Sequence, residues 1–235
     1  MTSSPLLIRA SGLPLELFRP AHVDACVSRA LIRTGDSTVE ELAARLRRQP
    51  DARETFRRSI LVSVSNRPAD GLEFSSLEQL IDTRLLGRGS PLSIWSAGCG
   101  DGTELYRVAE LLEQRGALEG ARLIGSDLQT DNIAAAQANQ LRPQSATCRA
   151  TIRLEQRDLL ADGPPPGRFN LVLCRNVAIY YKPRVQEKLH RSLASALRRD
   201  GILMLGSSEI LPHPERYGLE PLTRHLYGRA GACAA

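Results

Sequence analysis

A run of closely spaced glycines is the first feature with chemical meaning. The apolar stretch 92–97 leads directly into Gly98, Gly100 and Gly102, and a helix is predicted from Thr103 onward. Glycines in such a place let the backbone turn tightly and approach a ligand at the helix N-terminus. The loop predicts a ligand site, although a glycine-rich turn without a ligand has the same pattern.

An acidic residue follows this loop at the spacing found in nucleotide-binding folds. Asp127 lies 25 residues beyond Gly102, at the end of the next predicted strand, where a carboxylate can accept hydrogen bonds from both ribose hydroxyls. The alternative is a capping residue for a helix that begins at Thr130. Thr103 stands where the dinucleotide fingerprint requires a third glycine, which favours a nucleoside cofactor without a pyrophosphate.

Polar residues follow two further predicted strands. Asp158 and Leu159 come after the third strand, where they could reach an adenine ring, or form an ordinary turn. Arg175 and Asn176 end the fourth strand, at the sheet edge where doubly wound folds bind ligands. Tyr180, a few residues on, is either a site residue or a core aromatic.

The elements that position these residues form two regions. Helical periodicity up to residue 86 predicts a small N-terminal helical domain, residues 1–86. From residue 87 to 235, short apolar runs at 92–97, 122–126, 151–155, 170–174 and 202–206 alternate with helices at 103–114, 130–140 and 183–199. This alternation predicts an α/β domain with a Rossmann-like, doubly wound and mostly parallel sheet, closed by an antiparallel strand from 218–229.

Composition narrows the class of protein. The net charge is +5, but basic and acidic residues are interleaved, so nucleic-acid binding is not favoured. The 5 cysteines are scattered, which predicts neither a disulfide framework nor a metal site. We expect no membrane insertion and a cytoplasmic location, because the sequence has no apolar run long enough to span a bilayer and no signal peptide.

The order of these motifs resembles one known family. The segments 94–97, the glycine loop with Glu104 and Tyr106, the block 169–181 and the block 201–211 fall in the order found in bacterial chemoreceptor glutamate methyltransferases. The resemblance runs from about residue 15 to 229 and includes that family's helical domain. It implies S-adenosylmethionine as cofactor and a protein glutamate side chain as methyl acceptor.

The resemblance also implies roles for individual residues. Asp127 would hold the ribose, Asp158 and Leu159 the adenine, and Glu104 the amino group of the methionine moiety. Arg175 and Asn176 would lie beside the sulfonium, and with Tyr180 they are the expected catalytic residues. The expected cofactor-binding set is completed by Ser63 and Ser65 of the helical domain and by Gly98, Gly100 and Gly102.

The chain departs from the family in one conspicuous place. Only about 30 residues separate Asp127 from Asp158, too few for the β-subdomain with which family members dock their receptors. Smaller departures occur at Thr103, at residues 65–69 and at residues 206–209, where the family's glycine-histidine-serine-glutamate appears as glycine-serine-serine-glutamate.

Three functions remain open from the sequence. The first is carboxyl methylation of a glutamate in an acidic protein or peptide, which needs no general base and suits the lack of an obvious His-Asp or Cys-His pair. The second is methylation of a small molecule in a biosynthetic pathway, and the third is a cofactor-binding module without catalysis. His190 is expected on the exposed side of its helix, and no oligomeric state is predicted.

Overall fold

The computed structural model describes residues 5–61, 71–87, 91–140 and 152–229. The chain forms two compact units, Met1–Ser63 with Tyr180–Gln186, and Val64–Ile179 with Glu187–Ala235. The sequence predicted a domain boundary after residue 86, whereas the units divide between Ser63 and Val64. The helix from residue 71 packs in the core of the second unit. Ser63 and Ser65 lie outside the described residues.

The first unit is helical. It contains α1 (Pro5–Ser11), α2 (Pro20–Thr34), α3 (Val39–Arg48) and α4 (Pro50–Ile60), with a short 3-10 turn η1 at Leu15–Leu17. Side chains cap the start of helix α3: the Thr38 side chain accepts the Glu41 N–H at 3.2 Å, and the Glu41 side chain accepts the Ser37 N–H at 2.7 Å. The core of this unit is a single cluster of apolar side chains from all four helices.

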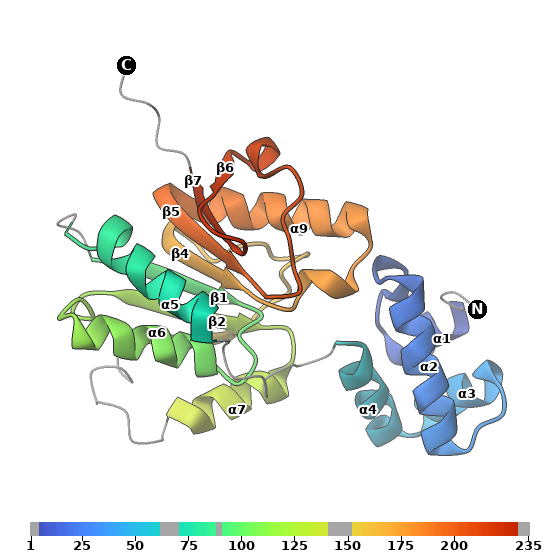
Figure 1. Ribbon diagram of the computed structural model, residues 1–235. Helices are drawn as coiled ribbons and strands as arrows, with labels where there is room; N and C mark the ends of the chain where they lie inside the picture. Colours follow the sequence, from blue (N-terminus) through green and yellow to red (C-terminus); the bar gives the residue numbers. More distant parts are fainter. Residues whose placement is uncertain (1–4, 62–70, 88–90, 141–151, 230–235) are drawn as a thin grey trace. The chain divides into compact units, whose positions relative to one another are not determined.

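The second unit is built on a seven-stranded sheet in the order β3-β2-β1-β4-β5-β7-β6 (Figure 1). Its strands are β1 (Ser93–Ala97), β2 (Arg122–Asp127), β3 (Ile152–Gln156), β4 (Phe169–Cys174), β5 (Leu197–Leu205), β6 (Leu219–Pro221) and β7 (Leu226–Arg229). The first five are parallel, and β7 is antiparallel to β5 and β6. The predicted Rossmann-like sheet is confirmed. Successive strands are added on one side of β1 up to β3 and on its other side from β4 onward.

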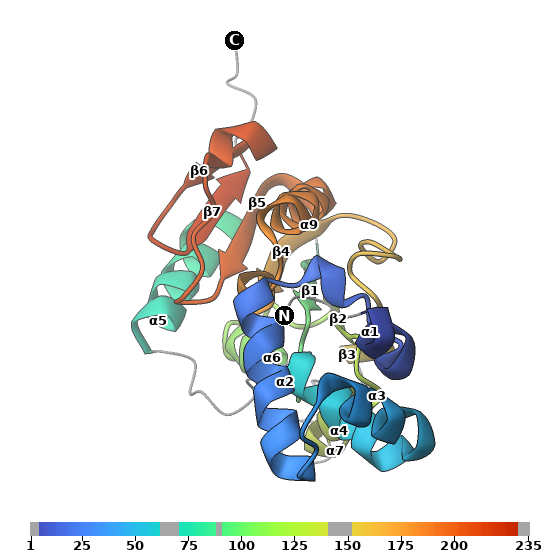
Figure 2. The same cartoon turned by 90° about the vertical axis from the view of Figure 1, so that its right-hand side faces the viewer.

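Helices cover both faces of this sheet. They are α5 (Gly71–Leu80) with the π-helical turn η2 (Ile81–Leu85), α6 (Thr103–Gln114), α7 (Thr130–Gln140) and α9 (Pro183–Ala196). Helices α5 and α9 lie on opposite faces (Figures 1 and 2). Helix α9 is shorter than predicted, because the chain already joins β5 at Leu197. None of the described helices combines the length and apolarity needed to cross a bilayer.

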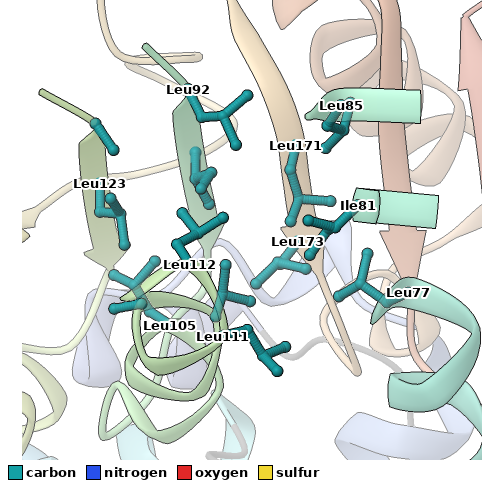
Figure 3. Close-up of a cluster of buried hydrophobic side chains, with 14 of the residues drawn as sticks. Leu77, Ile81, Leu85, Leu92, Leu105, Leu111, Leu112, Leu123, Leu171 and Leu173 are labelled. Carbon is teal, nitrogen blue, oxygen red and sulfur yellow. The ribbon is translucent and has the colours of Figure 1, made fainter. Parts of the chain in front are cut away.

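A hydrophobic core lies between the sheet and the helices α5 and α6. Leucines of α6 pack against β1 and β2, and residues of α5 and η2 pack against β4 (Figure 3). On β4, Leu171 and Leu173 are almost fully buried in this cluster. Each buried leucine contributes roughly 1.5–3 kcal/mol, so the strand ends that carry the polar residues are firmly anchored.

Candidate cofactor site and the turn after strand β4

The glycine loop joins β1 to α6 in a conformation that only glycine adopts readily. Gly98 and Gly102 have φ angles of 73° and 78°. A Cβ at Gly98 would lie 2.6 Å from a methyl group of Val177, and one at Gly102 would lie 2.6 Å from the Tyr106 ring. The loop therefore packs closely against the turn after β4 and the first turn of α6, at the carboxyl end of β1.

Asp127 connects this loop to the end of β2. Its Oδ2 accepts the Gly100 N–H at 3.0 Å, and its Oδ1 accepts the Gln129 N–H at 2.9 Å and the Asn132 side-chain amide at 3.0 Å. The side chain thus makes the turn contact that the capping alternative required. Oδ2 accepts the Gly100 N–H and, as a carboxylate oxygen, has capacity for a second donor such as a ribose hydroxyl.

Asp158 and Leu159 follow β3 at the same edge, since Asp127 pairs in register with Gln156 at the end of β3. Oδ1 of Asp158 accepts the backbone N–H groups of Leu160 and Ala161 at 2.8 and 3.1 Å. Asp158 therefore caps a local turn, and both predicted adenine contacts are half-buried. Their contact with adenine stays a prediction.

Arg175 and Glu104 form an ion pair between the end of β4 and the first turn of α6. The Arg175 side chain is 5% exposed, whereas that of Glu104 is 28% exposed. The structure thus brings together two residues that the resemblance assigned to different groups of the methionine moiety, Glu104 to the amino group and Arg175 to the sulfonium. A carboxylate at this helix N-terminus also interacts favourably with the helix dipole.

Asn176 begins a turn that a single buried carboxylate organises. Its φ angle is 57°, a left-handed conformation that asparagine tolerates better than most residues. Oε2 of Glu209 accepts the N–H groups of Asn176 and Gly206, each at 2.8 Å. Oε1 accepts those of Ala178 and Ile179 at 2.8 and 3.2 Å.

Glu209 is a buried acid at this turn that was not among the site residues expected from the sequence. It is 3% exposed. Burial raises its pKa above the ordinary value, while its four N–H donors oppose that shift. With two donors on each oxygen it is poorly placed to accept a proton from a substrate. The available signal was an acid within the apolar, glycine- and serine-containing segment that follows β5.

Tyr180 belongs to the first unit, where its ring lies 4.8 Å from that of His22 and its carbonyl accepts the Arg19 N–H at 2.9 Å. The side chain packs against the helical core, as the core-aromatic alternative required. Its catalytic role stays a prediction.

His190 is buried rather than exposed, which corrects the expectation from the sequence. It is 3% exposed on α9, and its ring lies edge-on to that of Tyr217 at 6.1 Å. Tyr217 belongs to the turn η4 (Pro214–Tyr217), so part of the burial comes from a segment that follows β5 in the chain. Burial lowers the pKa of His190 to about 4, so the ring is neutral near pH 7.

Metal ligands do not gather in the part of the chain that the structure describes: it holds no group of three or more His, Cys, Asp or Glu side chains suited to an ion. The geometry instead unites a glycine loop, an acid at the end of β2 and an ion-paired turn after β4. This combination fits a nucleoside with a zwitterionic tail.

Comparison with known proteins gives the same assignment. The model of the CheR methyltransferase SAM-binding domain matches residues 70–148 and 142–226. A chemotaxis protein methyltransferase of Listeria monocytogenes is 28% identical over 93% of this chain and 92% of its own length. Chemotaxis protein methyltransferase 1 of Pseudomonas aeruginosa is 24% identical over 95% and 94%.

Among solved structures, the CMeT domain of the citrinin polyketide synthase is 26% identical, with a TM-score of 0.44, over 69% of this chain and 41% of that one. The family match covers most of the second unit, including the whole of α5, which the sequence had assigned to the helical domain. The chain therefore belongs to the CheR methyltransferase family, with the fold of a class I methyltransferase and S-adenosylmethionine as its methyl donor.

Proposed function

We propose that this protein transfers a methyl group to the side-chain carboxylate of a glutamate in a protein acceptor. The proposal rests on the family and on one observation at the site. Glu209, the buried acid beside the Arg175–Asn176 turn, has both oxygens engaged by backbone N–H groups, and His190 is enclosed between α9 and η4. Neither is placed to act as a general base, which favours an acceptor that is already an anion.

The chemistry requires no proton transfer. When bound, S-adenosylmethionine would supply a methyl group on a sulfonium, which an acceptor carboxylate would take as the S–C electron pair stays on sulfur. The protein aligns the nucleophile with the methyl carbon and excludes water. The acceptor's negative charge is also attracted to the cationic donor in a closed site.

The described residues divide this work between binding and alignment. Asp127 would hold the ribose, Asp158 and Leu159 the adenine, and Glu104 the amino group. The turn that begins with Arg175 and Asn176 would lie beside the sulfonium. The residues fit such a group because the positive-φ glycines bring the backbone close to the end of β2, where Asp127 presents an oxygen with remaining capacity.

The acceptor class follows from the relatives' names and from charge. The relatives are chemotaxis protein methyltransferases, so the cytoplasmic portion of a chemoreceptor is the proposed partner, and a cytoplasmic location is part of the same proposal. The net charge of +5 favours an acidic acceptor.

Alkali treatment of the product tests the proposal. The purified protein is incubated with methyl-labelled S-adenosylmethionine and a soluble chemoreceptor fragment, and the product is then exposed to mild alkali. A glutamate methyl ester releases its label as volatile methanol. Label that survives alkali would refute carboxyl methylation.

A small-molecule methyltransferase is the second candidate, favoured by the short connection of about 30 residues between Asp127 and Asp158. It predicts alkali-stable label on a low-molecular-weight acceptor and none on the receptor fragment. Cofactor binding with no transfer to either class would favour a non-catalytic module.

A further inference from the structure

The segment after β5 and the turn after β4 are joined through one side chain. Glu209 lies beyond the carboxyl end of β5, and three of its four N–H donors belong to residues 176–179, beyond the neighbouring strand β4. The fourth donor is the N–H of Gly206, at the exit from β5 itself. The carboxylate thus links the two chain segments that leave the carboxyl ends of β4 and β5.

These bonds determine the path of the turn. Buried N–H groups must find acceptors, and those of Asn176 and Ala178 find theirs in Glu209. Bonds to a charged acceptor are stronger than neutral ones. Glutamine has the same shape but no charge, and its amide NH2 group would face two of the four N–H donors. Those two contacts would then be repulsive.

Gly206 also lies very close to this turn, and this contact involves no charged group. A Cβ at this position would lie 2.6 Å from Oδ1 of Asn176 and 2.8 Å from its backbone nitrogen. Those distances are too short for any real contact, so an alanine here must displace Asn176. Gly206 therefore offers a second way to move the turn, one that keeps the Glu209 carboxylate in the chain.

We propose that Glu209 is a positioning residue: its carboxylate fixes the turn that carries Arg175 and Asn176, and thereby sets how the site distinguishes the charged methyl donor from its neutral product. The inference rests on the proposed function, which places that turn beside the sulfonium. S-Adenosylmethionine and S-adenosylhomocysteine differ only in the methyl group and its positive charge, so their relative affinities report on this part of the site.

Calorimetric titration of both ligands tests the inference. The measured quantity is the ratio of the dissociation constants of S-adenosylmethionine and S-adenosylhomocysteine, for the wild type, Glu209→Gln and Gly206→Ala. We expect this ratio to change by about threefold or more in each variant, because both displace the turn. The matched control is Glu187→Gln, which removes a carboxylate from an exposed ion pair on α9 and should leave the ratio unchanged.

A merely structural role predicts a different result. Loss of folding alone would lower the melting temperature and the fraction of binding-competent protein, but would leave the ratio per competent site at the wild-type value. An unchanged ratio in folded Glu209→Gln would overturn the inference. If that variant does not fold, an unchanged ratio in Gly206→Ala has the same force.

Failure of the proposed function gives another pattern. A folded wild-type protein that binds neither ligand would refute the cofactor site, and the inference with it. Binding of both by the wild type, with equal weakening in the variants, would refute the positioning role alone.

Discussion

Replacement of Asp127 by asparagine changes one atom in a carboxylate whose contacts are known. The asparagine can still accept the Gln129 and Asn132 donors through its oxygen, but its amino group would then face the Gly100 N–H, now 3.0 Å from Oδ2. A hydrogen bond to a charged group contributes roughly 1.5–3 kcal/mol. We therefore expect a loss of about 1–3 kcal/mol in the free energy of unfolding.

Cofactor affinity should fall as well, if the same oxygen accepts a ribose hydroxyl. The same 1.5–3 kcal/mol corresponds to a roughly tenfold to hundredfold rise in the dissociation constant of S-adenosylhomocysteine. Adenosine and 2′,3′-dideoxyadenosine, compared by calorimetry in the wild type and in Asp127→Asn, isolate the ribose contribution. The variant should weaken adenosine and leave the dideoxy compound nearly unaffected.

Two results would refute this reasoning. An unchanged dissociation constant in a folded variant would remove Asp127 from the cofactor site. Equal weakening of adenosine and dideoxyadenosine would show that Asp127 acts only by holding the glycine loop.

Three further predictions concern stability. Gly98→Ala should lower the free energy of unfolding by about 1–3 kcal/mol more than Gly116→Ala in urea titrations, because both glycines have positive φ angles but only Gly98 has a side chain within 4 Å of an added Cβ; equal losses would contradict this. Leu173→Ala should cost about 2–5 kcal/mol, since the side chain is 1% exposed, whereas Ile210→Ala at 64% exposure should change little. His190 has a folded-state pKa of about 4 against 6.5 for the unfolded chain, so the unfolded state alone binds a proton between those values. Its contribution is complete above pH 6.5 and is lost as pH falls toward 4, by about 3 kcal/mol in all. His190→Phe should show a smaller loss between pH 7 and 4.5, and an identical loss would exclude this histidine as the cause.

The sheet was predictable because parallel strands leave a strong local signal. Strands β1, β2, β4 and the second half of β5 are short, largely buried runs, whereas β3 at the sheet edge alternates apolar and charged residues. The glycine loop marks the turn from the first strand to its helix. Asp127 could be placed at the sheet edge for the same reason. The closing segment was harder, since β6 and β7 are only three and four residues long and were predicted as one strand.

The remaining misses depend on contacts between distant segments. A helix at residues 71–80 is visible in the sequence, but whether its apolar face covers other helices or β4 is decided by tertiary packing. His190 contacts the ring of Tyr217, which lies more than twenty residues later in the chain, and helical periodicity does not report such a contact. Glu209 could be seen as an acid, but its four donors come from two separate loops, and no periodicity reports such convergence.

The residues Tyr180–Gln186 have a consequence for how the protein can be divided. They belong to the first unit, where Phe18 bridges to Tyr181 and the N–H of Lys182 donates to the Leu17 carbonyl at 2.9 Å. The helical unit is thus discontinuous in the chain, and an enzyme truncated before residue 64 would keep seven of its residues without their partners. Deleting the N-terminal helices would strip the backbone pairing from the segment that directly follows Ile179, one of the Glu209 donors. The helical unit therefore cannot be removed without loss, because a separately expressed second unit would carry residues 180–186 without their backbone partners.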